Sequence, residues 1–405
     1  MGPMRLISLM GLIGLMGLGL MGCSKDQAAQ PQTEKSTEVQ LMSYVAEYDE
    51  AKRTNEANEA NEANRANGTN APYGASSYGP TRGWIPPSGF SVFDDPEQSI
   101  SVFFTQTPST AGEERFFFTS SGKWRISGEA LTAGTYYYLY GYLPHDKSIT
   151  TTASVLPGDG KTYAHGAVLT MTNVPTVSPA DFCVMIAAKN GKDYGYTDSG
   201  DYSITGLQRG DFQYVAGGAS NNYVFLLFEH LFSAMRLRMR VQGDYNDLRT
   251  IKLKELKLKT FAGEAATKKK TNVTITLTAN NEGNDPITGV TFTPYGADTE
   301  AGSVFTSEAG FELNEDYQEF TGHFMPQGVT SVILESTYDV YDKKGNLVRP
   351  GCTSTNTLNL NMFSGQTQAL RGRRYTVNLT INPTFLHVMS DPDLDDPEVT
   401  MDAVD

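Results

Sequence analysis

From residue 84 onward the chain consists of short apolar runs separated by Gly, Pro, Asn and Asp, with few stretches of helical period. Runs of this length and spacing predict β-strands joined by tight turns, as in a β-sandwich. The abundance of Tyr and Phe agrees with this, because aromatic residues favour strands. Six such runs precede residue 190, at residues 90–93, 100–106, 115–120, 135–143, 167–172 and 182–188. We therefore expect an all-β fold.

The second half of the chain alternates more clearly. In residues 236–241 (RLRMRV) three arginines occupy one face and Leu, Met and Val the other. Residues 273–277 and 375–381 alternate apolar residues with Thr and Asn in the same way. Alternation of this kind predicts antiparallel strands with one face in water.

One strand in this half carries a slip in its pattern. Ile251 and Leu253 share one face, whereas Leu256 and Leu258 have the opposite parity. One inserted residue in a ladder is a β-bulge, so we predict a bulge at residues 254–255.

The first residues predict export. Arg5 precedes an uncharged run that ends in the sequence LMGC at residues 20–23. The run is too short to span a bilayer, and no second such run follows. The tetrapeptide resembles a lipobox, which predicts a signal peptide over residues 1–22 and a lipid on Cys23. An ordinary secretory signal with an incidental cysteine is the alternative, but an A-x-A-like cleavage site is absent.

Composition then divides the mature chain. Residues 23–82 are polar and repeat Asn-Glu-Ala, so we expect a disordered tether, apart from residues 39–48, which suit a short helix or an added strand. A Gly-rich polar stretch before residue 210 predicts a boundary between an N-terminal β-sandwich, residues 83–209, and a C-terminal one, residues 210–390. Residues 391–405 form an acidic tail.

Charge and cysteine content narrow the class of protein. The 46 acidic residues against 32 basic ones argue against nucleic acid as a partner. Three cysteines, one of them the lipidation candidate, cannot build a disulfide framework. Stability must therefore come from packing.

Candidate chemistry is sparse. The five histidines form no recognised catalytic or metal-binding motif, and no carboxylate pair stands out. His230 lies in residues 221–235, which are apolar on all sides and predict a buried strand running into a helical turn, so a structural, hydrogen-bonded histidine is favoured over a ligand. The acidic tail imitates a calcium loop, but Asp396 replaces its glycine. We expect no catalytic residue, metal or cofactor, and hence no enzyme.

Four tyrosines at strand spacing offer one binding surface. Tyr136, Tyr138, Tyr140 and Tyr142 would line one face of a strand, and such a platform can stack sugars. The other face is apolar as well, through Tyr137, Leu139 and Leu143. A strand that is apolar on both faces is typical of an internal position, so packing is favoured over binding.

Three phrases of the sequence resemble one known family. They are YYYLYGYLP at residues 136–144, FEHLFSAMRLRMRV at residues 228–241 and GRRYTVNL at residues 372–379. Together with the lipobox they are similar to the fimbrillins, the subunits of type V pili, in their Mfa-like branch. The resemblance implies two tandem transthyretin-like β-sandwich domains and a lipid-anchored location on the outer membrane at the cell surface.

The resemblance also implies a way of assembling. Fimbrillins polymerise by strand exchange, in which a protease cuts after an arginine and the vacated groove accepts a strand from another subunit. Arg53, Arg65 and Arg82 are the candidate cleavage points here. The expected partners are other pilus subunits, the outer membrane through the lipid, and a host protein or glycan. The alternative function is a glycan-binding surface lipoprotein that uses the tyrosine platform with Trp84 or Trp124.

The C-terminal strand completes these expectations. Residues 375–389 are predicted to supply the last strands of the second sandwich, and Pro383 should end one strand or move it to an edge. The acidic residues that follow are expected to stay exposed.

Overall fold

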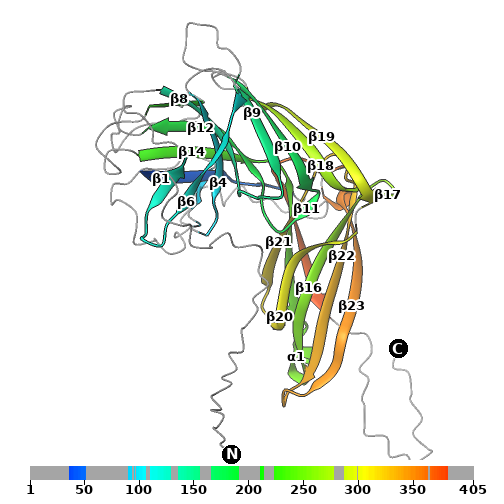
Figure 1. Ribbon diagram of the computed structural model, residues 1–405. Coiled ribbons are helices and arrows are strands. Elements are labelled where there is room, and N and C mark those ends of the chain that lie inside the picture. The colour runs from blue at the N-terminus through cyan, green and yellow to red at the C-terminus, as the bar shows by residue number, and fades with distance from the viewer. Residues whose placement is uncertain are drawn as a thin grey trace, which may run out of the picture.

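The computed structural model describes residues 36–51, 90–93, 95, 97–105, 110–128, 136–155, 166–190, 210–213, 223–277, 287–298, 300–363 and 365–381. Within these ranges the chain is mostly β-structure, with one short helix, α1 (Gly243–Leu248), and one 3-10 turn, η5 (Leu360–Met362). Among them, no helix has the length and apolar character needed to cross a membrane. The strands form four sheets in two lobes (Figure 1).

The first lobe contains a nine-stranded sheet that closes on itself. Its strands are β1 (Ser36–Ala46), β3 (Phe90–Phe93), β4 (Ile100–Thr105), β6 (Glu113–Phe118), β7 (Trp124–Ser127), β8 (Tyr136–Leu143), β12 (Cys183–Asn190), β13 (Gly210–Gln213) and β14 (Tyr223–His230). The pairing order runs β12-β14-β1-β7-β6-β4-β8, and β8 also pairs with β12. Seven strands therefore form a closed ring, to which β3 and β13 are added.

A second sheet packs on the outside of this ring. It contains β5 (Thr110–Ala111), β9 (Thr150–Val155), β10 (Ala167–Pro175), β18 (Lys268–Leu277) and β19 (Ile287–Asp298). All its pairings are antiparallel, in the order β19-β18-β10-β9-β5. Phe103 and Tyr140 of the ring and Leu169 and Ile275 of this sheet belong to one buried cluster, while Val102 and others fill a separate core.

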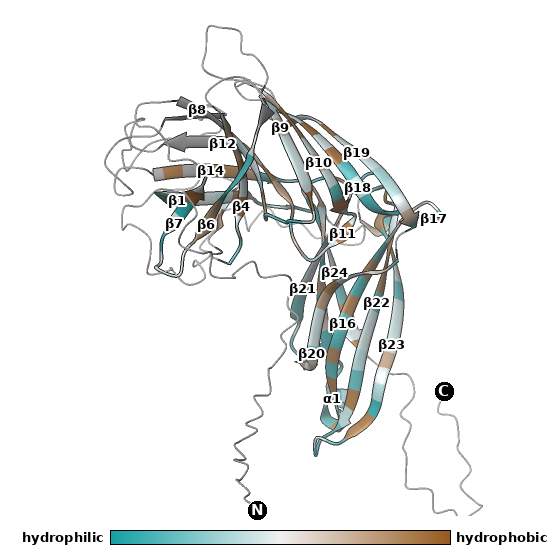
Figure 2. Ribbon diagram, viewed as in Figure 1, coloured by the Kyte–Doolittle hydropathy of each residue, from teal (hydrophilic) through white to brown (hydrophobic). Residues whose placement is uncertain are grey.

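Two further sheets make the second lobe. One contains β2 (Asp49–Glu50), β11 (Val177–Ser178), β15 (Ser233–Val241), β21 (Gln318–Phe324) and β24 (Arg373–Ile381). The other contains β16 (Arg249–Ala262), β17 (Ala265–Ala266), β20 (Gly302–Leu313), β22 (Ser331–Asp342) and β23 (Leu347–Asn359). Leu237, Leu258 and Tyr375 belong to the core cluster between them. Apolar and polar bands alternate along β16 and β22 in Figure 2, as this packing requires.

Most strand predictions are confirmed. All six early runs fall on strands, namely β3, β4, β6, β8, β10 and β12. β15 buries Leu237, Met239 and Val241 as its alternation predicts. The bulge is confirmed as well, because the pairings of β16 with β20 and β22 both shift register between Leu253 and Glu255.

Two local predictions are wrong. β24 was expected to be antiparallel, but it pairs in parallel with both of its neighbours, β15 and β2. Alternation fixes which residues are buried and does not fix strand direction. The helical turn expected after His230 is instead a two-residue bend between β14 and β15.

The sheets combine distant parts of the chain. β14 and β1 are neighbours, as are β18 and β10, so strands from both sides of residue 210 share sheets. Residues 36–51 lie within the segment expected to be a tether, and they form β1 and β2. Of the two alternatives for residues 39–48, helix or strand, the structure has a strand.

Candidate functional site

Residues 36–51, called the N-terminal segment below, belong to both lobes. β1 pairs in parallel with β14 on one side and antiparallel with β7 and β3 on the other. β2 follows after two residues and pairs in parallel with β24 of the second lobe. The segment therefore crosses from the closed ring to the second lobe (Figure 1).

Side chains on both faces of β1 are buried, each in a different core. Val39 is 3% exposed and belongs to the ring's inner core, whereas Tyr44 is 4% exposed and packs between the ring and the outer sheet. Ser43 Oγ donates a hydrogen bond of 2.9 Å to the Phe93 carbonyl. At the start of the strand, Arg125 Nε donates one of 2.7 Å to Ser36 Oγ. β1 is thus an integral strand of the ring.

The end of the segment is fixed by charge and backbone contacts. The Glu50 carboxylate accepts hydrogen bonds from Arg374, Arg236 and the Thr376 hydroxyl. The Ala51 amide donates to the Arg374 carbonyl at 2.9 Å, and the Ala51 side chain is buried in the core of the second lobe.

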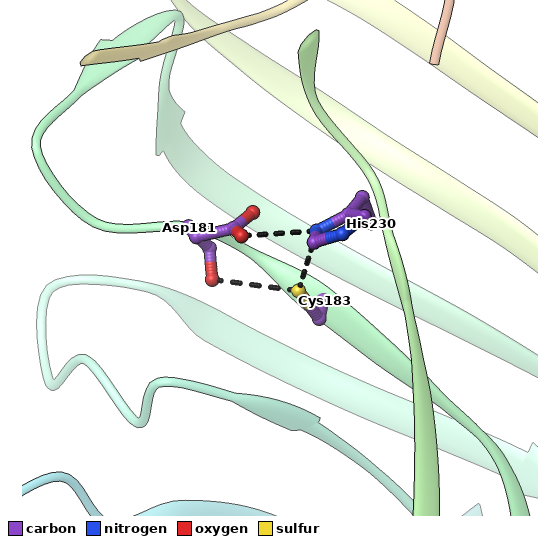
Figure 3. A group of neighbouring side chains, drawn as sticks. All are labelled: Asp181, Cys183 and His230. Carbon is purple, nitrogen blue, oxygen red and sulfur yellow. Dashed lines mark hydrogen bonds and ion pairs between the residues drawn. The ribbon is translucent and has the colours of Figure 1, made fainter. Parts of the chain in front are cut away.

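Between β1 and β2 the segment passes over a polar cluster, shown in part in Figure 3. Cys183 begins β12, His230 ends β14, and these two residues face each other in the antiparallel register. Asp181 lies two positions before Cys183. His230 Nδ1 is 2.9 Å from Asp181 Oδ2 and 3.3 Å from Cys183 Sγ. Adjacent strand ends thus bring a carboxylate, a thiol and an imidazole together.

The N-terminal segment covers this cluster directly. The Tyr48 ring stacks on His230, with 3.5 Å between ring centroids and 14° between planes. The Tyr48 hydroxyl donates a 2.7 Å hydrogen bond to Asp181 Oδ1, and His230 Nε2 lies 2.5 Å from the Ala46 carbonyl oxygen. His323, from β21 of the second lobe, lies 3.9 Å from Asp181 Oδ2 through its Nε2. The cluster therefore joins both lobes and the segment.

Burial sets the ionisation of the cluster. Burial raises the pKa of the Cys183 thiol well above its ordinary value, and the Asp181 carboxylate adds to this. Burial also raises the pKa of Tyr48, and it lowers that of His323. Burial raises the pKa of the Asp181 carboxyl, but the contacts of Asp181 with His230, His323 and the Tyr48 hydroxyl outweigh burial and hold that pKa below its ordinary value. Asp181 is therefore the charged centre of the group.

The structure places two of the four tyrosines of the predicted platform in the core. Tyr140 and Tyr142 are 1% and 0% exposed and belong to the core between the ring and the outer sheet. The side chains of Tyr136 and Tyr138 lie outside the described residues. Tyr137, on the opposite face, is buried in the ring. Burial of this kind supports the packing interpretation of the strand.

Several predicted residues cannot be placed. Cys23, Arg53, Arg65, Arg82 and Trp84 all lie outside the described residues, as do residues 382–405 with Pro383 and the acidic tail. Trp124 is half-buried on β7 and packs edge-on against Phe118 at 5.4 Å between centroids.

His230 was predicted to be structural, whereas its partners in the cluster were not predicted. The burial and hydrogen bonding predicted for His230 are confirmed. Asp181, Tyr48 and His323 come from three distant parts of the chain, so no local sequence motif indicates that they meet at His230. The one available signal was the spacing of Asp181 and Cys183 at the start of a predicted strand.

No protein-family model matches the chain, and no curated protein does. Among solved structures, it is similar to a candidate cell adhesion protein from Bacteroides uniformis, at 11% identity over 70% of this chain and 86% of that one, with a TM-score of 0.31. Two proteins from Bacteroides ovatus are also similar. One is a candidate cell adhesion protein (12% identity, 85% and 92% covered, TM-score 0.28), and the other a candidate adhesin (8%, 90% and 98%, 0.21).

Proposed function

We propose that this chain is a structural or accessory subunit of a cell-surface pilus of the fimbrillin type, that it assembles by β-strand exchange and that it supports adhesion. In this proposal the protein is not an enzyme. A lipid on Cys23 anchors it at the outer membrane, and the two lobes correspond to the two transthyretin-like sandwiches of that family. Its partners are other pilus subunits and a host protein or glycan.

The position of β1 supports this proposal. β1 is hydrogen-bonded on both sides, yet in the sequence the N-terminal segment is separated from β3 by residues 52–89, which contain Arg53, Arg65 and Arg82. A cut after any of these arginines would leave the N-terminal segment bound by non-covalent contacts alone. Its loss would expose a row of unpaired amides and carbonyls on β14 together with pockets for alternate side chains. Such a groove suits a strand from another subunit, because the free backbone groups can hydrogen-bond to that strand and the pockets can hold its alternate side chains.

The runner-up function has less support. A glycan-binding platform needs exposed rings, and two of its four tyrosines are buried in the core. We therefore place the pilus role first.

Arginine-specific proteolysis of the purified protein tests the proposal. The protein should be cut between residues 51 and 90, release the N-terminal segment slowly, and then form polymers visible by electron microscopy. A variant with Arg53, Arg65 and Arg82 all changed to Lys is the matched control, which should stay uncut and monomeric. A synthetic peptide of residues 36–51 should compete with polymer formation. Release of the segment without polymers, and without uptake of the peptide, would refute strand exchange.

A further inference from the structure

The Asp181, Cys183 and His230 cluster has the geometry of a metal site. Ligand atoms from these three residues all lie within 4.8 Å of one another. Around a tetrahedral zinc ion, with bonds of about 2.0–2.3 Å, neighbouring ligand atoms are about 3.3–3.8 Å apart, the shorter distance being that between nitrogen and oxygen. Two of the three separations, 2.9 Å and 3.3 Å, need to open by about half an ångström or less for an ion of this size, and the third lies within 4.8 Å.

The histidine orientations suit coordination. A carbonyl oxygen can only accept, so the contact of His230 Nε2 with the Ala46 carbonyl places a hydrogen on Nε2, and Nδ1 is the nitrogen that faces Asp181 and Cys183. His323 repeats the arrangement. Its Nδ1 lies 3.1 Å from the Pro179 carbonyl, which places a hydrogen on Nδ1 and turns Nε2 toward Asp181. Metal-binding histidines are typically oriented by such a bond from the far nitrogen.

His230 Nδ1 and the Asp181 carboxylate face each other. Nδ1 and the Asp181 carboxylate are 2.9 Å apart, and something positive must lie between them. A proton on Nδ1 is one solution and gives a buried ion pair. A metal ion is the other, and it would also engage the Cys183 thiol, whose Sγ lies 3.3 Å from the same Nδ1.

We propose that Asp181, Cys183 and His230, with His323 as the fourth ligand, bind a transition-metal ion of the zinc class. Thiolate and imidazole ligands favour zinc, cobalt and similar ions over calcium and magnesium, which prefer oxygen. In the metal-free cluster the carboxylate disfavours the thiolate, but a bound divalent cation reverses that effect and deprotonates a coordinating thiol.

The site is coupled to the N-terminal segment. Ala46 orients His230, and the Tyr48 hydroxyl holds Asp181 while its ring covers the imidazole. Loss of such supporting hydrogen bonds typically weakens metal binding by about 10–100-fold. A bound metal therefore favours the segment in place, and release of the segment weakens the metal.

Cobalt and zinc binding to the full chain test the site. After treatment with a chelator, Co²⁺ should bind with the charge-transfer band of a thiolate ligand and the visible bands of a tetrahedral ion, and Zn²⁺ should displace it in a one-to-one ratio. Cys183→Ser should lose the charge-transfer band, and His323→Gln should weaken binding. The matched controls are Cys352→Ser, at the other described buried cysteine, and His145→Gln, at a histidine beside Glu113, and both should bind as the wild type does.

Two readouts keep the proposal falsifiable if a ligand variant fails to fold. Native mass spectrometry of the wild type should show one zinc ion, and Tyr48→Phe, which leaves every ligand intact, should bind it about tenfold more weakly. A wild type that takes up no zinc overturns the proposal. So does one that binds cobalt without a thiolate band, or binds it equally well in Cys183→Ser, because the ion then lies elsewhere.

Discussion

Replacing Tyr142 by alanine separates the packing role of the tyrosine strand from a role in binding. Tyr142 is fully buried, packs in the core between the ring and the outer sheet, and donates a 3.2 Å hydrogen bond to Glu113 Oε1. Removing a buried aromatic ring of this size costs about 3–5 kcal/mol, since it leaves a cavity that neighbours fill only partly. We expect the free energy of unfolding to fall by that amount.

Urea unfolding followed by tryptophan fluorescence measures this change, because Trp124 lies in the same nine-stranded sheet. Tyr341→Ala is the matched control. Its ring is half-buried beneath the Lys252 ammonium, 4.7 Å from the centroid, so its loss should cost about 1 kcal/mol or less. If Tyr142→Ala were as stable as the control and instead lost binding on a glycan array, the packing interpretation would be wrong. The result would then favour a glycan-binding platform.

Three further predictions follow from single residues. Gly141→Ala should cost about 1–3 kcal/mol or more in thermal or urea unfolding, because a Cβ there would lie 2.2 Å from the Ser101 carbonyl oxygen, whereas Gly289→Ala, with its nearest atoms at 4.0 Å, should be tolerated. Burial raises the pKa of Tyr142 to about 12, whereas the unfolded chain ionises near 10. As the pH rises from about 10 through 12, the free energy of unfolding of the wild type should therefore fall by roughly 3 kcal/mol relative to that of Tyr142→Phe. Parallel curves of stability against pH would contradict this. Metabolic labelling with a fatty acid should mark the wild type and leave Cys23→Ala unlabelled, and equal labelling would exclude lipidation there.

Local patterns predicted what each strand buries. The opposite parities of Leu253 and Leu256 located the bulge of β16, because only an inserted residue lets both reach the same core. Alternation likewise predicted the buried residues of β15 and β18. These successes share a cause, since burial depends on positions one or two residues apart.

Pairing partners were beyond such patterns. The alternation of Tyr375, Val377 and Leu379 is the same whether β24 is parallel or antiparallel, so its direction was predicted wrongly. For the same reason nothing in residues 273–277 shows that β18 pairs with β10. The cluster around Asp181 has this origin too, because it exists only where the ends of β12 and β14, the N-terminal segment and β21 meet.

The N-terminal segment connects the two proposals physically. If it were a simple extension, its loss would affect only its own contacts. Instead its removal would open the ring between β14 and β7 and leave a cavity where Tyr44 packs in the core. It would also remove the contacts that Ala46 and Tyr48 make with the cluster. The part of β14 that pairs with β1 ends at Phe228, two residues before His230, the last residue of that strand. A strand from another subunit that enters this groove therefore meets the cluster at its end. A donor with a carbonyl opposite His230 Nε2 would restore the metal site, and one without it would leave the site weakened.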